Sequence, residues 1–232
     1  MTRRLYSEDA YLGECPATVE DVTERGVILN ATVFYPTGGG QPGDVGELRW
    51  DGGSATVADT VAQEDGRIVH VLADDASAPQ PGTEVSAKID FERRHRLMRM
   101  HTCLHLLSAV LPYPVTGGQV SDGSGRLDFD LPDSPDKAQV EAELQRLIEQ
   151  DHPVGERWIS EAELDAQPEL VKTLSVKPPR GADRIRLLDI PGVDLQPCGG
   201  THVKRTGEIG AVRVVKIENK GKMNRRVKLE LA

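Results

Sequence analysis

Two pairs of potential metal ligands, far apart in the sequence, constrain the fold of this chain more than any other feature. His101 and His105 stand four residues apart in the segment HTCLH, and Cys198 and His202 stand four residues apart in CGGTH. On an α-helix, this spacing places both side chains of a pair on one face, one turn apart. Imidazole and thiolate together form a ligand set that Zn²⁺ favours. A fold that joins the two pairs would therefore create a mononuclear zinc site, and we expect such a fold.

Two further kinds of zinc site fit part of this pattern. In metalloproteases with the motif H-E-x-x-H, a glutamate follows the first histidine as general base, but Thr102 stands at that position here. A structural zinc site would use all four ligands and leave no place for water. A hydrolytic site would need one of the four to be weakly held or to lie behind the others. Cys103 and Cys15 are interpreted as buried apolar residues and not as ligands.

The composition indicates an acidic globular protein. The 232 residues carry 28 Lys and Arg against 37 Asp and Glu, a formal net charge of −9, so any RNA binding must come from local basic clusters. The three cysteines are an odd number with no disulfide framework, which suits the reducing cytoplasm. The N-terminal segment has no apolar signal region, and no apolar run approaches ~18 residues. We therefore expect neither secretion nor a membrane span.

Residues 1–90 predict a small all-β domain. Short segments that favour strands alternate with Gly, Pro and Asp; they are CPATVEDVTERGVILN, ATVFY, GELRW, ATVADTVAQ, RIVHVL and TEVSAKID. The first of these segments predicts a hairpin with its turn near 24–26. Strands at this spacing are typical of a small β-barrel. The Pro- and Ala-rich stretch 73–84 is predicted to be a linker or a long loop.

The rest of the chain predicts a domain of mixed helices and strands. Apolar residues at intervals of three and four predict a helix over 93–111, ended by Pro112; they are Leu97, Met100, Leu104, Leu107 and Leu111. Further helices are predicted over 137–150 and from Ser160, which can form a capping box with Glu163. Pairs of strands are predicted over 116–131 and 210–232, the latter with its turn at 219–221. We therefore predict an α+β fold with a barrel domain (1–90) and a two-layer α+β domain (91–232).

The segment FYPTGGGQPGD, residues 34–44, contains three consecutive glycines. It lacks the Lys-Ser/Thr of a Walker loop, and no βαβ pattern surrounds it as in a dinucleotide-binding motif. One interpretation is a tight turn between strands of the barrel. The other is a loop whose backbone approaches a ligand, with Thr37 and Gln41 as additional donors and acceptors. The Gly-Gly-Gln at 117–119 is similar, but this tripeptide alone is weak evidence.

Five segments, in this order along the chain, resemble a known family. They are FYPTGGGQPGDVGEL, RRHRLMRMHTCLHLLSAVL, TGGQVSDGSGRLDFD, PCGGTHV and IENKGKMNRRVKLEL. The last four resemble the editing domain of alanyl-tRNA synthetase, which threonyl-tRNA synthetase also contains. With the glycine-rich segment upstream, the chain resembles a freestanding alanyl-tRNA editing protein of the AlaX type, in its medium-sized class. The resemblance covers nearly the whole chain.

The resemblance implies an activity, a cofactor and a partner. The implied reaction is hydrolysis of tRNA(Ala) mischarged with serine, with glycine as a further substrate that the sequence does not decide. The implied zinc residues are His101, His105, Cys198 and His202, and the loop 38–41 is implied to face the zinc pocket. No class II synthetase core or ATP site is visible in the sequence, and about 230 residues would hardly hold both. We therefore expect neither aminoacylation nor use of ATP.

Candidate catalytic residues come from the glycine-rich loop. Gln41 and the backbone N–H groups of Gly39 and Gly40 are expected to stabilise an oxyanion or to position water, while zinc polarises the ester, activates water or anchors the substrate. Thr37 is the candidate partner of the serine hydroxyl, because a site that hydrogen-bonds this group rejects alanine. The alternative for Thr37 is a turn residue that satisfies its own backbone.

Basic side chains near the C-terminus are the candidate tRNA-binding residues. They are Lys216, Lys220, Lys222, Arg225 and Arg226, with Lys228 beside them. A second basic cluster at 93–99 precedes the first ligand pair. Such clusters are usually solvated faces, but in an acidic chain two of them flanking the expected site favour contacts to phosphate. Two alternatives to a tRNA-editing enzyme are a zinc-stabilised tRNA-binding module without catalysis and a zinc hydrolase of small esters.

Overall fold

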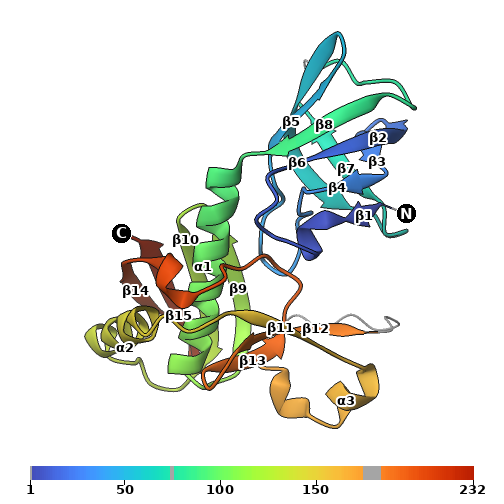
Figure 1. The fold of residues 1–232 in the computed structure, drawn as a ribbon. Helices are drawn as coiled ribbons and strands as arrows, with labels where there is room; N and C mark the ends of the chain where they lie inside the picture. The colour runs from blue at the N-terminus through green and yellow to red at the C-terminus, as the bar shows by residue number, and fades with distance from the viewer. Residues whose placement is uncertain (1, 74–75, 175–183) are drawn as a thin grey trace. The chain divides into compact units, whose positions relative to one another are not determined.

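The computed structural model describes residues 2–73, 76–174 and 184–232 of the chain (Figure 1). The chain divides into two compact units, Met1–His95 and Arg96–Ala232, and the division falls inside helix α1 (Phe91–Val110). The α+β class and the N-terminal barrel predicted from the sequence are confirmed. The assignment of an editing role to domain 91–232 stays a prediction.

Among the described residues of the first unit, antiparallel strands close into a barrel in the order β2-β3-β7-β6-β5-β8. Their bounds are β2 (Glu14–Thr23), β3 (Gly26–Leu29), β5 (Gly46–Trp50), β6 (Gly53–Ala62), β7 (Ile68–Leu72) and β8 (Glu84–Ile89). In β2, Cys15, Ala17 and Val19 are buried in the barrel core while their neighbours are more exposed. This period of two is the pattern that a filled barrel requires.

Shorter elements complete the first unit. Strand β1 (Arg3–Arg4) pairs in parallel with β4 (Ala31–Thr32), and the 3₁₀ helix η1 (Leu5–Ser7) follows β1. The predicted hairpin at 24–26 is confirmed, because Thr23 pairs with Gly26 across a two-residue turn. Of the predicted linker 73–84, residues 74 and 75 lie outside the described part of the chain, and β8 begins at its last residue.

Helix α1 carries the first ligand pair and is buried in an unusual way. Every residue from 100 to 108 is buried, so this stretch of the helix is enclosed on all sides and not only along the predicted apolar stripe. Gly125 of the neighbouring sheet lies so close to α1 that a Cβ there would come within 2.8 Å of the Met100 side chain. The absence of a side chain at Gly125 thus lets the helix approach the sheet.

The described residues of the second unit also form two antiparallel sheets (Figure 1). The four-stranded sheet has the order β14 (Val212–Gly221), β15 (Asn224–Leu231), β10 (Ser124–Asp130) and β9 (Val115–Ser121). The three-stranded sheet has the order β11 (Gly155–Ile159), β12 (Ile185–Ile190) and β13 (Asp194–Pro197). Helix α2 (Lys137–Glu149) contacts β14, where Glu141 accepts a hydrogen bond of 2.7 Å from the Val214 N–H.

The remaining elements of the second unit give one confirmation and two corrections of the predictions. The predicted capping box is present, since Ser160 and Glu163 exchange hydrogen bonds at the start of α3 (Glu161–Asp165). The 3₁₀ helices are η2 (Pro168–Leu170) and η3 (Thr206–Ile209). The predicted turn at 219–221 is wrong, because β14 continues to Gly221 through a bulge and the turn lies at 222–223. The three-stranded sheet has no counterpart in the prediction.

Candidate metal centre

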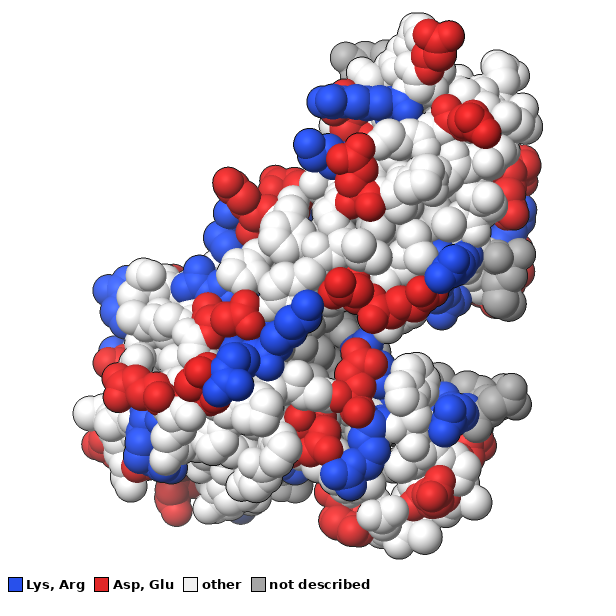
Figure 2. Space-filling view, viewed as in Figure 1, with Lys and Arg blue, Asp and Glu red and all other residues white. Residues whose placement is uncertain are grey.

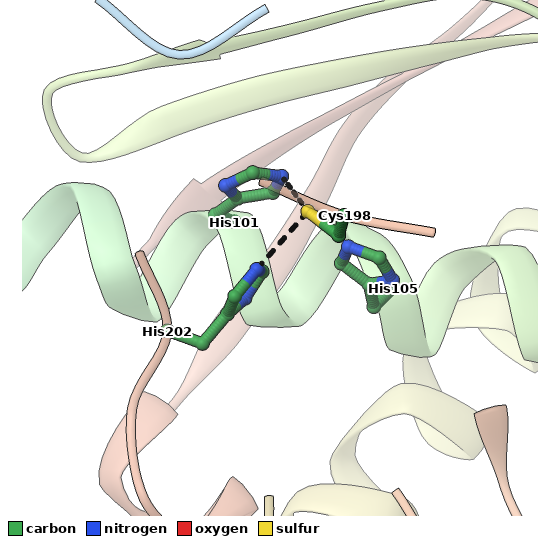
Figure 3. Close-up of side chains that lie close together, drawn as sticks. All are labelled: His101, His105, Cys198 and His202. Atoms are coloured by element: carbon green, nitrogen blue, oxygen red, sulfur yellow. Dashed lines mark hydrogen bonds between the residues drawn. The ribbon is translucent and has the colours of Figure 1, made fainter. Parts of the chain in front are cut away.

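The two ligand pairs meet in the second unit. His101 and His105 lie one turn apart on α1, and both are buried. Cys198 and His202 lie in the loop that follows β13. Figure 3 shows the four side chains turned toward one another. The fold therefore joins the two distant pairs in one cluster, as we expected from the sequence.

The spacing of the donor atoms suits a single metal ion. One ligand atom from each of the four residues lies within 4.8 Å of all the others. Cys198 Sγ is 3.6 Å from Nε2 of His101 and 3.2 Å from Nε2 of His202. A tetrahedral zinc site with bonds of about 2.0–2.3 Å separates its ligand atoms by about 3.3–3.7 Å. Three imidazoles and one thiol at this spacing could hold a metal ion.

Arg186 of β12 fixes the loop that carries Cys198. Its guanidinium donates to the carbonyl oxygens of Cys198, at 2.9 Å, and of Gly200. The Cys198 N–H donates to the Arg186 carbonyl at 3.2 Å. Glu156 of β11 pairs with the same guanidinium at 3.0 Å. The backbone around the Cys198 ligand is thus held by a side chain of the adjacent sheet.

A buried carboxylate orients the ring of His105. Asp194 Oδ2 lies 2.8 Å from His105 Nδ1 and accepts from Gln196 Nε2 at 2.7 Å. Asp194 Oδ1 lies 2.5 Å from Lys172 Nζ. Since an ionised carboxylate only accepts hydrogen bonds, the imidazole carries a proton on Nδ1 and presents Nε2 to the cluster.

Thr102 orients His202 in the same way. The Thr102 hydroxyl donates to the Met98 carbonyl at 2.9 Å, and His202 Nδ1 lies 3.3 Å from the same oxygen. Because the hydroxyl proton is used within the helix, the oxygen accepts from His202 Nδ1 and leaves Nε2 for the cluster. Thr102, which occupies the position of the general base in metalloproteases, therefore positions His202.

The electrostatics of the cluster favour the metal-binding forms of Cys198 and His202, whereas His105 favours its protonated form. Burial would raise the pKa of Cys198, but the neighbouring histidines outweigh it and hold that pKa well below its ordinary value. Burial would lower the pKa of His105, yet the Cys198 thiolate and Asp194 raise it to about 9. Desolvation lowers the pKa of His202 to about 3. The cluster thus offers a thiolate and a neutral imidazole, and a metal ion would displace the proton of His105.

Four residues that support the ligands were not predicted from the sequence. They are Lys172, Arg186, Asp194 and Gln196. One signal could have found two of them, because Asp194, Gln196 and Cys198 recur at every second position, which places them on one face of a strand. The interpretation of the other two cysteines is confirmed, since Cys15 and Cys103 are both buried. Burial raises the pKa of the Cys103 thiol to about 12.

The glycine-rich segment lies in the first unit and forms a tight turn. Gly38 and Gln41 exchange two backbone hydrogen bonds, of 3.0 and 2.9 Å. Between them, Gly39 has a φ of 57° and Gly40 a φ of 82°. Positive φ at both central residues is the requirement of a type I′ turn. The turn interpretation therefore accounts for Gly39 and Gly40.

The side chains of this segment are also engaged. Thr37 Oγ1 accepts a hydrogen bond of 2.8 Å from the Gly43 N–H across the loop, which is the turn role considered as its alternative. Gln41 is only 1% exposed. The catalytic roles expected for Thr37, Gly39, Gly40 and Gln41 stay predictions.

The basic residues expected to bind tRNA lie on β14, β15 and the turn between them. Lys216 and Lys220 pair with Glu218 at 3.0 and 3.1 Å, and Arg226 pairs with Asp128 at 2.7 Å. On the face seen in Figure 2, basic and acidic side chains are interspersed. Lys222 is exposed in the turn. These side chains remain predicted contacts to phosphate.

Arg225 and Arg94, from the two basic clusters, have structural roles. Arg225 is 6% exposed, and its guanidinium donates to the carbonyls of Gly221 and Pro132. Arg94 is fully buried and pairs with Asp44. Burial of both guanidinium groups argues against a phosphate contact by either residue.

None of the described helices combines the length and the apolar character needed to cross a bilayer.

Comparison with known proteins places the chain among proteins of alanyl-tRNA metabolism. The family "Threonyl and Alanyl tRNA synthetase second additional domain" matches residues 185–228, and "tRNA synthetases class II (A)" matches residues 10–93. "Alanyl-tRNA editing protein AlaX-M" of Methanosarcina acetivorans is 37% identical over 98% of this chain and 98% of its own length. The protein of the same name from Saccharolobus solfataricus is 34% identical, with the same coverage of both chains. The alanine–tRNA ligase of Pyrobaculum neutrophilum is 37% identical over 94% of this chain, but the match covers 25% of that ligase.

Proposed function

The chain belongs to the family of alanyl-tRNA editing proteins, and from this premise we propose that it deacylates mischarged tRNA(Ala), chiefly Ser-tRNA(Ala), with Gly-tRNA(Ala) as a second substrate. The observation that carries the proposal is the meeting of four ligands, His101, His105, Cys198 and His202, within 4.8 Å. Because an aminoacyl ester is already activated, its hydrolysis needs no ATP. The proposed location is the cytoplasm, where tRNA is charged.

Zinc is the metal that the donor set supports best. Three imidazole nitrogens and a thiolate suit Zn²⁺, whereas Mg²⁺ and Ca²⁺ prefer oxygen ligands. When bound, the ion would supply Lewis acidity toward an ester carbonyl or a water molecule. Asp194 and Thr102 hold the two imidazoles in register, and Arg186 holds the Cys198 loop. Such support of the ligands is characteristic of a working metal site.

The burial of the ligands supports a site that a substrate can reach. His101 and His105 are buried, whereas Cys198 is only partly buried. A closed structural zinc site would need all four ligands at once, while hydrolysis requires a place for water or substrate. The partial exposure of Cys198 as a residue is the observation that favours the hydrolytic alternative. Asp194 is already engaged by Lys172, His105 and Gln196, which supports a positioning role for it and not that of a general base.

Discrimination between serine and alanine depends on one hydroxyl group. A site that hydrogen-bonds this hydroxyl leaves a buried polar group unpaired when alanine enters, so the correct product Ala-tRNA(Ala) is spared. The ratio of Ser-tRNA(Ala) to Ala-tRNA(Ala) deacylation, compared between the wild type and a variant, therefore tests whether the substituted residue contacts the hydroxyl. Thr37 stays the predicted residue, and an unchanged ratio in Thr37→Val would remove it from this role.

The test of the proposal is a deacylation assay with defined substrates. The purified protein is incubated with Ser-tRNA(Ala), Gly-tRNA(Ala) and Ala-tRNA(Ala), each with and without a chelator. We expect rapid loss of serine, slow loss of alanine, and recovery of the chelated protein on addition of Zn²⁺. Tight binding of tRNA without ester hydrolysis would support the zinc-stabilised binding module instead.

A salt titration separates the tRNA substrate from a small ester. Phosphate contacts release counterions, so KM for Ser-tRNA(Ala) should rise steeply between about 50 and 200 mM salt, in the way seen for nucleic-acid complexes in general. Hydrolysis of a serine ethyl ester serves as the control, because it lacks phosphates. A KM that does not depend on salt would favour the hydrolase of small esters.

A further inference from the structure

The three-stranded sheet has two faces with different surroundings. On one face, residues of β11 and β12 pack into an apolar cluster with α3 and η2; the buried members are Ile159, Leu164, Leu170, Ile185 and Leu187. The side chains of the opposite face alternate with these. That second face includes Asp194 and Gln196 of β13, which contact His105 and Ser108 of α1. It is therefore the face that belongs to the metal site.

The register of the strands places Trp158 on the face of the metal site. Trp158 of β11 pairs directly with Arg186 of β12, and directly paired residues point to the same side of a sheet. On the other side of β12, Leu187 pairs with Pro197 of β13. Because these strands are antiparallel, the neighbouring residues Arg186 and Cys198 lie opposite each other, and Cys198 is the third member of the row. The hydrogen bond from the Cys198 N–H to the Arg186 carbonyl, 3.2 Å, confirms this alignment. Trp158, Arg186 and Cys198 thus form one row across the sheet.

The row of paired residues gives an approximate distance between the indole and the ligand cluster. Neighbouring strands are about 4.8 Å apart, so the backbones of Trp158 and Cys198 are separated by two spacings, or about 10 Å. Between them lies the Arg186 guanidinium, which is already committed to Glu156 and to the Cys198 loop. The indole is accordingly close to the metal site without contributing to its construction.

Trp158 exposes a large aromatic side chain to solvent, and its position in the second unit gives no structural reason for this exposure. The side chain belongs to β11, an edge strand of the sheet, and the residue is 45% exposed. Its neighbours Glu156 and Arg157 are exposed as well, whereas Ile159 is buried in the apolar cluster. An exposed aromatic ring on a polar strand is a surface on which a nucleobase can stack, and stacking accepts any base.

We propose that Trp158 is a stacking platform for the terminal, unpaired nucleobase of the tRNA acceptor end while the ester lies at the metal cluster. The inference rests on the proposed deacylase function and names the part of the substrate that this face recognises. The ester and the terminal base are substituents of the same ribose, so both lie within the span of one nucleotide. The indole and the cluster lie in one row of one sheet, which matches this arrangement. A second copy of this chain that covered Trp158 is the competing occupant, and the test separates the two.

The first measurement is the kinetics of variants that keep or remove the aromatic ring. Trp158→Ala should lower kcat/KM for Ser-tRNA(Ala) by about 5- to 100-fold, mainly through KM, the range expected for one stacked base. Trp158→Phe should retain most of the wild-type value. Tyr113→Ala is the matched control, because Tyr113 is 43% exposed in the same unit and is not part of the row. Equal kcat/KM for Trp158→Ala and the wild type would overturn the inference.

The second measurement follows the fluorescence of the indole itself. The chain has two tryptophans, so Trp50→Phe leaves Trp158 as the single reporter. An uncharged RNA hairpin with the acceptor-stem sequence and its single-stranded 3′ end should quench this fluorescence. The same hairpin without its terminal nucleoside should quench it at least several-fold less at equal occupancy. Equal quenching by both RNAs would overturn the inference.

Two controls keep the outcomes distinct. If the wild-type protein does not release serine from tRNA, the proposed function itself fails; if it does and Trp158→Ala matches it, only the role of Trp158 fails. Sedimentation of wild type and Trp158→Ala tests the competing occupant. A change of oligomeric state on removal of the ring would assign Trp158 to contact between copies and overturn its role in base stacking.

Discussion

At the scale of single residues, the hydrogen bonds behind the ligands decide how the cluster presents its donor atoms. Asp194 accepts from His105 Nδ1 and is held in turn by Lys172. Asp194→Asn removes the negative charge that keeps this ring oriented, so the affinity for Zn²⁺ should fall by about 10- to 100-fold. Competition against a chromophoric chelator measures the affinity directly, without reference to catalysis.

Asp189→Asn is the matched control for this prediction. Asp189 lies on β12 and pairs with Arg157 at 2.7 Å. Side chains alternate between the two faces along a strand, and Asp189 is three positions after Arg186 on β12. Asp189 therefore points to the face of the sheet opposite the metal site. Its loss should leave the zinc affinity within about twofold of wild type. An Asp194→Asn protein with the affinity of the control would show that the carboxylate does not position His105.

A buried histidine far from the ligands in sequence makes stability depend on pH. His70 is fully buried, with Nδ1 3.0 Å from the Val27 carbonyl and Nε2 2.7 Å from Thr32 Oγ1. Burial lowers its pKa to about 4, against 6.5 in the unfolded chain. Between these values the unfolded chain binds a proton that the folded chain does not, so the free energy of unfolding falls as pH drops from 6.5 toward 4.

His70→Gln should remove most of this acid loss, because glutamine stays neutral and can hydrogen-bond. The wild type should lose about 2–3 kcal/mol more than the variant between about pH 7 and pH 4 from this group alone. Urea unfolding of both proteins at the two pH values gives the difference. Parallel losses in the two proteins would mean that His70 is not the group responsible.

The ligands could be predicted from the sequence, but the residues that orient them could not. The i, i+4 spacing of His101 and His105 is a local signal that a helix converts directly into geometry. The contact between His105 and Asp194 joins positions 89 apart, and only the tertiary fold creates it. Thr102 occupies the position of a protease base in the sequence, yet its hydroxyl supports His202. That role depends on a residue 100 positions away, which no local pattern reveals.

At the scale of elements, the tight turn of the glycine-rich segment needs a glycine at position 40 but not at position 38. Gly40 has a φ of 82°, a conformation that costs an L-residue about 1–2 kcal/mol. A Cβ at Gly38 would meet the Tyr35 hydroxyl at 3.5 Å, an ordinary contact. Gly40→Ala should therefore lower the free energy of unfolding by about 1 kcal/mol, whereas Gly38→Ala should leave it nearly unchanged.

The same pair of variants tests whether the backbone of this turn approaches a ligand. A Gly38→Ala protein of normal stability that loses deacylation would assign Gly38 to substrate contact, since its own structure tolerates a methyl group. Equal destabilisation by both substitutions, measured by urea unfolding, would contradict the turn geometry on which this prediction rests.

Elements with a clear period were predictable, and those without one were not. Cys15, Ala17 and Val19 alternate with more exposed positions along β2, and runs of this kind predict the barrel. Strand β11 is exposed at four successive positions, 155–158, so it offers no alternation that could reveal it. The turn expected at 219–221 lies at 222–223, because a bulge beside Gly221 lets β14 continue past the expected turn.

At the scale of the whole molecule, the first unit contains one of the two tryptophans, and the second unit contains the other together with the four candidate metal ligands. Trp50 packs against the barrel core of the first unit, and Trp158 lies in the second unit with the metal cluster. An ion that binds only the folded state stabilises it by an amount that grows with the logarithm of its free concentration. Removal of Zn²⁺ should therefore act first on the unit that holds the four ligands.

Single-tryptophan proteins test this prediction at the level of each unit. In Trp50→Phe, which leaves Trp158, chelation should lower the midpoint of thermal unfolding by several degrees or more, as expected for a loss of roughly 3 kcal/mol or more of binding energy. In Trp158→Phe, which leaves Trp50, the shift should be smaller, because the barrel core contains none of the ligands. Equal shifts in the two proteins would show that the units unfold as one cooperative block, and no shift in either would show that the cluster does not bind zinc in the folded chain.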